Sequence, residues 1–128
     1  MKAILRRGFL LSFLIFHLCI AAIWAQDYTS SSKKAIKLYV KGQELYDSRQ
    51  NDLAVVQLKA ALEIDSSFIE VYLLLAGVHS EVSSPKDAID AYRKAVAIDP
   101  SFFPPALFNL ASLELHIGDY TNARTHYK

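Results

Sequence analysis

Four histidines carry the side chain best suited to acid–base chemistry or metal binding: His17, His79, His116 and His126. An imidazole is the commonest protein ligand for transition metals and a frequent general base. None of them lies in an HExxH motif, and a CxxC motif is excluded because the chain has one cysteine. The spacing therefore predicts no metal site. We expect His79 to pack partly buried, and His116 and His126 to lie at the surface.

Motifs for covalent catalysis and phosphate binding are absent too. The sequence has no GxSxG turn around an activated serine, no cysteine–histidine pair and no glycine-rich phosphate loop. No pair of carboxylates is spaced for general acid–base work. We therefore predict no catalytic residue, no cofactor and no small-molecule substrate, and the chain is expected to be non-enzymatic.

The charge of the chain argues against nucleic acid as a partner. Lysine and arginine number 14 against 13 acidic residues, a net charge of +1. Removing residues 1–25 takes away three basic residues, Lys2, Arg6 and Arg7, and no acidic one, which changes the net charge to −2. No cluster of basic residues remains to contact phosphates or anionic lipid. Protein is the expected partner.

Residues 69–100 carry the pattern of two amphipathic helices. Apolar or aromatic residues recur at i, i+3, i+4 and i+7 in the first half, and a similar stripe continues in the second. These stripes contain Tyr72, Leu75, Ala76 and His79, then Ala88, Tyr92 and Ala95. The small alanines would let the two backbones approach closely.

Start and stop signals divide these helices. Ser84 is a predicted N-cap, with Pro85 at the first helical position and Asp87 completing a capping box. Pro100 disfavours helix at Asp99, so the second helix should end there. The segment thus predicts helix, turn, helix and stop.

The same pattern recurs along the chain at a fixed period of about 34 residues, and this is the strongest signal in the sequence. The matching positions are Ala54 with Ala88, Ala61 with Ala95, and Leu62–Asp65 with Val96–Asp99. A third copy begins after Pro100, where Gly118 can take a positive φ at a helix end and Asp119 can cap the next helix. Repetition of a helix pair at this period is typical of a solenoid.

Most of these residues are of the kinds found in the pattern W-x2-L-G-x2-Y…A-x3-F…P, so the chain resembles a tetratricopeptide-repeat (TPR) protein. The resemblance implies an all-α, antiparallel helix-pair solenoid of about two and a half to three repeats. We expect a TPR domain at 35–128, with repeats at about 35–68, 69–102 and 104–128, after a polar connector at 26–34. The connector should be flexible, with one serine capping the next helix. The last repeat is truncated, so we expect further protein after Lys128.

The resemblance also implies a binding surface. In TPR arrays the first helix of each repeat lines a concave groove, through its positions 2, 5, 9 and 12. In this chain those positions carry a mixture of aromatic, aliphatic and polar side chains, which suits binding of a peptide or helix of a partner protein. The predicted groove residues are Tyr39, Gln43, Tyr46, Glu70, Leu73, Ser80, Phe108, Ser112 and Leu115, with Ile36, Gly77 and Pro105 completing the face.

Two departures from the family pattern narrow the expectation. Chaperone-binding TPR proteins hold a C-terminal carboxylate with a basic-and-asparagine clamp, but here the matching positions carry Ile36, Val40, Leu74, Pro105 and Asn109, so the clamp is absent. Glu114 stands where the repeat usually has tyrosine. We expect it at an edge of the helix pair, with its carboxylate reaching solvent.

Residues 1–25 have the three parts of a secretory signal peptide. A basic start is followed by the apolar run from Phe9 to Ile23, and Ala25 is a small residue before a polar segment. The alternative is an uncleaved anchor in the inner membrane, although the run is shorter than the ~20 residues of a spanning helix.

The amino-acid sequence after Pro100, in a chain that begins with such a signal, resembles the N-terminal TPR segment of Bacteroidetes-type envelope proteins with OmpA-like C-terminal domains. This likeness implies an exported, non-enzymatic scaffold in the periplasm or at the outer membrane, associated with the envelope through a downstream domain. The alternative is a docking module on a larger protein whose downstream part is an enzyme.

Overall fold

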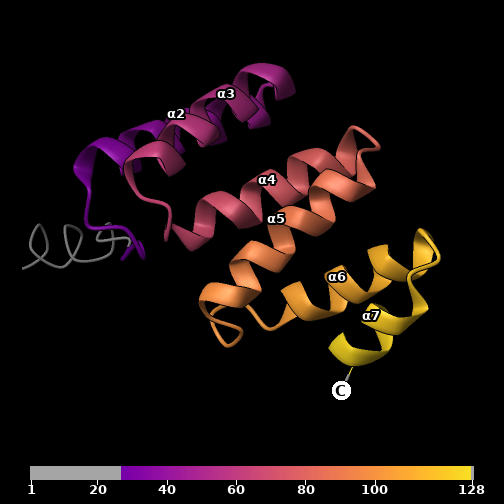
Figure 1. The fold of residues 1–128 in the computed structure, drawn as a ribbon. Coiled ribbons are helices and arrows are strands. Elements are labelled where there is room, and N and C mark those ends of the chain that lie inside the picture. The colour runs from indigo at the N-terminus through magenta and orange to yellow at the C-terminus, as the bar shows by residue number, and fades with distance from the viewer. Residues whose placement is uncertain (1–26, 128) are drawn as a thin grey trace, which may run out of the picture.

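The computed structural model describes residues 27–127, which form six helices and no strand (Figure 1). The helices are α2 (Lys33–Asp47), α3 (Asn51–Ile64), α4 (Ile69–Glu81), α5 (Pro85–Ile98), α6 (Pro105–His116) and α7 (Tyr120–His126). Successive helices pack as the pairs α2–α3, α4–α5 and α6–α7, and each pair contacts the next. The predicted all-α solenoid of helix pairs is confirmed for this part of the chain.

The predicted signal peptide lies outside the described residues. Within 27–127, none of the helices has the length and hydropathy needed to span a bilayer.

The same turn ends the first helix of every pair. Arg49, Ser83 and Gly118 adopt positive φ values of 61°, 58° and 82°. The following residue returns a backbone hydrogen bond to the helix, from Gln50 to Leu45, Ser84 to His79, and Asp119 to Glu114, at 2.8–2.9 Å. This left-handed turn satisfies carbonyls at the helix end and reverses the chain. Gly118 has the predicted conformation, whereas Arg49 and Ser83 adopt it despite their side chains.

The helix starts follow the prediction in part. Ser32 caps α2 by accepting a hydrogen bond from the Ala35 N–H at 3.3 Å, and Asp119 caps α7 by accepting one from the Asn122 N–H. Hydrogen bonds lower the pKa of Asp119, and the one donated by the Asn122 side chain has the largest effect. Ser84 does precede α5 and Pro85 opens it, but the Ser84 side chain makes no capping bond. The capping box predicted with Asp87 is therefore not formed.

Small residues let the helices approach, and larger apolar ones fill the space between pairs. The alanines of the repeated stripes are almost completely buried: Ala54, Ala61, Ala76, Ala88, Ala95, Ala111 and Ala123. Phe68, Leu58 and Leu110 are the largest fully buried apolar side chains. The core therefore runs through the stack as a continuous layer rather than a single central cluster, as expected of a solenoid.

Two helical glycines provide a matched pair of stability predictions. A Cβ at Gly42 would lie 2.8 Å from two atoms of fully buried Leu58, while a Cβ at Gly77 would meet nothing within 4 Å. We expect Gly42→Ala to lower the free energy of unfolding by about 1–2 kcal/mol, because overpacking exceeds the gain in helix propensity. Gly77→Ala should raise it by about 0.5–1 kcal/mol. Urea unfolding of both variants checks the prediction, and a shift of the same sign in both would contradict it.

Candidate functional site

The predicted groove residues all lie on α2, α4 or α6, the first helix of each pair. None is completely buried. Tyr39, Tyr46, Glu70, Leu73 and Ser112 are half-buried, whereas Gln43, Ser80, Phe108 and Leu115 are exposed. We call this set of residues the first-helix groove, after the binding surface predicted from the sequence. The repeat period brings residues from three distant stretches of sequence onto corresponding helices.

One end of the first-helix groove, between α2 and α4, is occupied by the chain's own connector. The Tyr28 ring contacts Tyr39 at a centroid distance of 5.5 Å and Phe68 at 6.0 Å, both edge to face. Thr29 bonds to Glu70 through its backbone N–H, at 2.9 Å, and through its hydroxyl. Ser30 is buried. The expectation of a flexible connector is therefore wrong for residues 28–30, because an aromatic ring and a hydroxyl find partners on two helices.

Two pKa shifts reflect this packing. Burial, followed by the nearby Tyr28 and Glu70, raises the pKa of Tyr39 above that of an ordinary tyrosine. On the other side, hydrogen bonds from Ser30 and then Ser67 lower the pKa of Asp65. The connector is thus in contact with the ends of both α3 and α4.

The opposite end of α2 is polar. The Tyr46 hydroxyl donates to Glu81 at 2.6 Å, and Arg49 forms an ion pair with the same carboxylate at 3.0 Å. The hydrogen bond to Glu81 is the main reason that the pKa of Tyr46 is raised. These contacts join the first two helix pairs. Tyr46 therefore holds α2 against α4, besides being a predicted groove residue.

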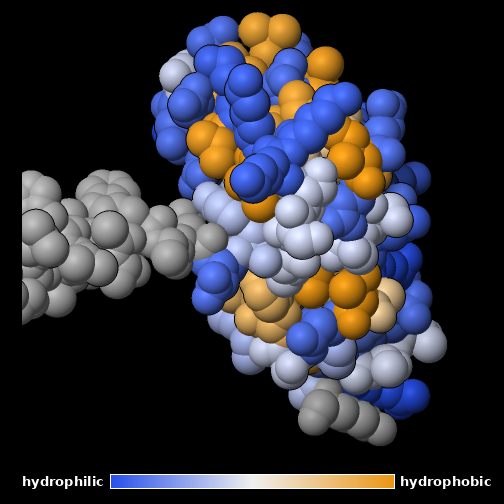
Figure 2. Space-filling model, turned by 90° about the vertical axis from the view of Figure 1, so that its left-hand side faces the viewer, coloured by the Kyte–Doolittle hydropathy of each residue, from blue (hydrophilic) through white to orange (hydrophobic). Residues whose placement is uncertain are grey.

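The α6 part of the groove is apolar and open. Phe108 is 61% exposed and Leu115 42% exposed. Phe108 meets Tyr127 edge to face at 5.8 Å, and the Ser112 hydroxyl lies 3.3 Å from that of Tyr127. On the face shown in Figure 2, hydrophobic residues form separate patches divided by polar ones.

An ionic cluster centred on a buried carboxylate, which the sequence pattern did not predict, joins the last three helices. Glu114 of α6 is completely buried, and Arg93 of α5 donates to its Oε1 at 2.8 Å and 3.2 Å. His126 Nδ1 of α7 lies 2.7 Å from Glu114 Oε2. Asp119 adds a longer contact to Arg93 at 3.5 Å. The solvent-facing edge position predicted for Glu114 is wrong, because its side chain is buried and Arg93 and His126 each contact one of its carboxylate oxygens.

The surface position predicted for His126 is also wrong, since its side chain is only 23% exposed and packs on Glu114. His116 is exposed, as predicted, whereas His79 is half-buried, also as predicted. The signal that could have predicted the cluster is Glu114 itself, which stands where the repeat usually has tyrosine. A carboxylate on an otherwise apolar stripe needs a partner, and Arg93, one pair earlier, supplies it.

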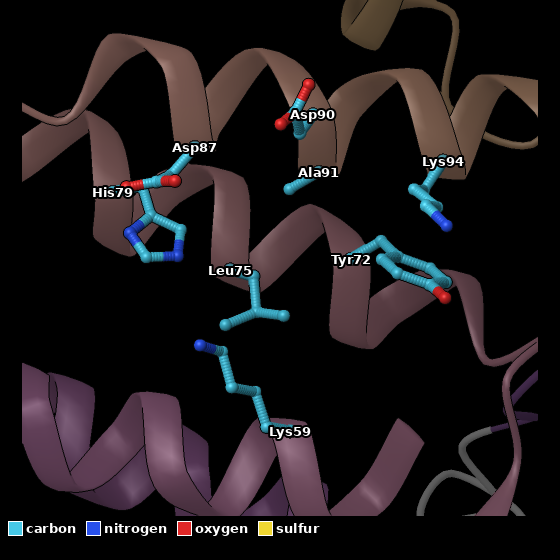
Figure 3. Close-up of a pocket in the computed structure, with 8 residues that line it drawn as sticks. All are labelled: Lys59, Tyr72, Leu75, His79, Asp87, Asp90, Ala91 and Lys94. Atoms are coloured by element: carbon cyan, nitrogen blue, oxygen red, sulfur yellow. The ribbon is translucent and has the colours of Figure 1, made fainter. Parts of the chain in front are cut away.

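A shallow pocket of about 250 Å³ lies on a different face of α4 (Figure 3). Its floor is formed by Tyr72, Leu75 and His79 of α4, and its rim by charged residues of α3 and α5: Lys59, Asp87, Asp90 and Lys94. Across residues 27–127 no group of three or more histidine, cysteine or acidic side chains is arranged to hold a metal. The pocket's mixed charges suit a solvated surface better than a reactive centre.

Comparison with known proteins defines the class of this fold. The family model described as Tetratricopeptide repeat matches residues 69–102, the stretch that contains α4 and α5. This segment is therefore similar to a TPR, and further helix pairs stack on either side of it. No curated protein sequence matches the chain.

Solved structures extend the likeness beyond that segment. MamA aligns with a TM-score of 0.68 at 21% identity, over 73% of this chain and 54% of MamA, so the chain spans about half the length of that relative. The first TPR of Spaghetti (RPAP3), bound to an HSP90 peptide, aligns at 0.67 and 18% identity, over 76% of each chain. SycD of Yersinia enterocolitica, in complex with a peptide of the translocator YopD, aligns at 0.66 and 22% identity, over 75% and 72%. The protein thus has a TPR fold.

Proposed function

We propose that this protein is a non-enzymatic scaffold that binds a peptide or helix of a partner protein in the first-helix groove. The observation that carries the proposal is the exposed apolar surface of α6, where Phe108 is 61% exposed. Large apolar side chains clustered at a surface commonly mark an interaction site. Structures of the same fold are seen with peptides, the HSP90 peptide on Spaghetti and the YopD peptide on SycD.

The groove and its ligand should depend on apolar contacts more than on charge. Leu73 and Phe108 occupy corresponding positions on α4 and α6, so each offers the partner an apolar contact. The clamp residues that hold a terminal carboxylate are missing here, so the ligand is better described as an internal segment than as a chain end. Anchors of this kind dominate interface energies.

The test replaces Leu73 and Phe108 by aspartate, singly, and measures capture of partner protein by the immobilised chain. Each substitution should weaken capture by roughly 30-fold or more, because it removes an anchor and places a charge against an apolar ligand. Val56→Asp is the matched control, since Val56 is 58% exposed on α3, outside the groove. Undiminished capture by both groove variants, with unchanged unfolding midpoints, would overturn the proposed function.

We also propose that the protein is exported to the periplasm or the outer membrane. The support is the basic start, the apolar run and the small Ala25 of residues 1–25.

A further inference from the structure

The contact between the connector and the start of α4 has the chemistry of peptide recognition. Phe68 precedes α4 as its N-cap and offers no side chain to the free N–H groups of the first turn. The Thr29 hydroxyl takes that role from 40 residues away, accepting a hydrogen bond from the Ile69 N–H at 3.0 Å. The helix start therefore binds a hydroxyl that is not part of the helix.

Glu70 completes the recognition of Thr29. One carboxylate oxygen accepts the backbone N–H of Thr29 at 2.9 Å and the other accepts its hydroxyl proton. This hydroxyl uses both its donor and its acceptor capacity, so alanine or valine would remove the bond from the Ile69 N–H and the contact to the second Glu70 oxygen. The geometry selects threonine or serine at this point of the connector, where the backbone bends before α2.

An aromatic position precedes the hydroxyl. The Tyr28 ring lies against Tyr39 and Phe68, whose own centroids are 5.2 Å apart. Edge-to-face packing on two rings favours an aromatic side chain over an aliphatic one of similar size. Tyr39 and Glu70 are both first-helix groove residues, so the connector lies where a ligand was expected.

The next helix pair does not repeat this arrangement. The groove residue of α6 that corresponds to Glu70 is Pro105, which has no carboxylate. Phe102, one repeat period after Phe68, is 40% exposed. The carboxylate and the buried phenylalanine that contact the connector therefore occur together at the α2–α4 end and are not repeated at α6.

We propose that this end of the first-helix groove is a subsite for a non-helical protein segment with an aromatic residue followed by threonine or serine, and that residues 28–30 fill it in cis. A partner segment of the same chemistry must then displace the chain's own connector, which acts as an intramolecular competitor. The proposal rests on the proposed function, because it names the class of ligand for one part of the groove.

The experiment uses the full chain and a fluorescently labelled synthetic peptide, QDYTSS, which copies residues 26–31. Tyr28→Ala/Thr29→Ala in the chain removes the competitor, and this variant should bind the peptide at least about tenfold more tightly than the parent chain. Adding Glu70→Gln to the variant should weaken binding at least about tenfold. The peptide QDAASS is the matched control and should not bind. Equal affinity of parent and variant for QDYTSS, or equal binding of both peptides, would overturn the proposal.

A second measurement needs no substitution in the chain. Hydrogen exchange of the parent is followed with and without millimolar QDYTSS. Displacement should speed exchange of the Thr29 N–H, while the Ile69 N–H stays protected because the free peptide supplies a new hydroxyl. An unchanged exchange rate of the Thr29 N–H at saturating peptide would overturn the proposal that residues 28–30 compete with a ligand for the subsite. Both readouts omit the partner, so they can succeed while capture through Leu73 and Phe108 fails, or fail while capture succeeds.

Discussion

Replacing Arg93 by alanine is expected to lower the free energy of unfolding by about 3–5 kcal/mol, because it leaves a buried carboxylate without its main partner. Glu114 is 0% exposed, and Arg93 makes two hydrogen bonds to its Oε1. The Arg93 side chain itself is 41% exposed, so it keeps part of its hydration in the folded state. The two partners are therefore unequal, and removing the arginine is the more damaging change.

A second substitution isolates the charge from the shape of the site. Glu114→Gln keeps an oxygen that can accept from Arg93 and an amide that can donate to His126, so alone it should cost about 1–2 kcal/mol. In the Arg93→Ala background the same change should stabilise the protein, because a neutral amide is less costly to bury than a carboxylate. The expected coupling between the two sites is about 1–3 kcal/mol.

Urea unfolding of the parent, both single variants and the double variant measures this cycle. The control is Lys41→Ala, since the Lys41–Glu44 pair has both side chains more than half exposed and should contribute less than about 1 kcal/mol. A loss below about 1 kcal/mol for Arg93→Ala would contradict the prediction and would mean that His126 alone compensates for the buried charge.

The helix pairs could be predicted from the sequence because their determinants are local and repeated. Alanines at matching positions predict close helix approach, Pro85 and Pro100 mark a helix start and stop, and Gly118 marks a left-handed turn. Each signal depends on neighbours within one or two turns. The repeat period then orders the pairs without any knowledge of long-range contacts.

Features that depend on distant partners could not be predicted in the same way. Glu114 is 21 residues from Arg93, and Thr29 is 41 residues from Glu70. A polar connector without periodicity is typical of a flexible segment, and only the space between α2 and α4 reveals that an aromatic residue and a hydroxyl fit there. Glu114, which departs from the repeat pattern, proved to have such a long-range partner.

Phe68 and Phe102 show how far identical repeat positions can differ. They lie one repeat period apart, and each follows an aspartate turn, Asp65-Ser66 or Asp99-Pro100. The aspartates even make the same contacts, Asp65 accepting from Ser67 and Asp99 from Ser101, both hydroxyl contacts at 2.6 Å. Nevertheless Phe68 is 0% exposed and Phe102 is 40% exposed, because the connector and Tyr39 cover only the first of them.

We therefore expect Phe68→Ala to lower the free energy of unfolding by about 3–5 kcal/mol, since it empties a filled core position. Phe102→Ala should cost less than about 1 kcal/mol, because that ring is partly in water in the folded state. Removing Phe68 also removes one wall of the Tyr28 contact, so the Thr29 N–H should exchange faster in that variant alone. Urea unfolding and hydrogen exchange of the two variants measure both effects. Equal losses of stability would show that the repeat position, and not the connector and Tyr39, sets the contribution of this phenylalanine.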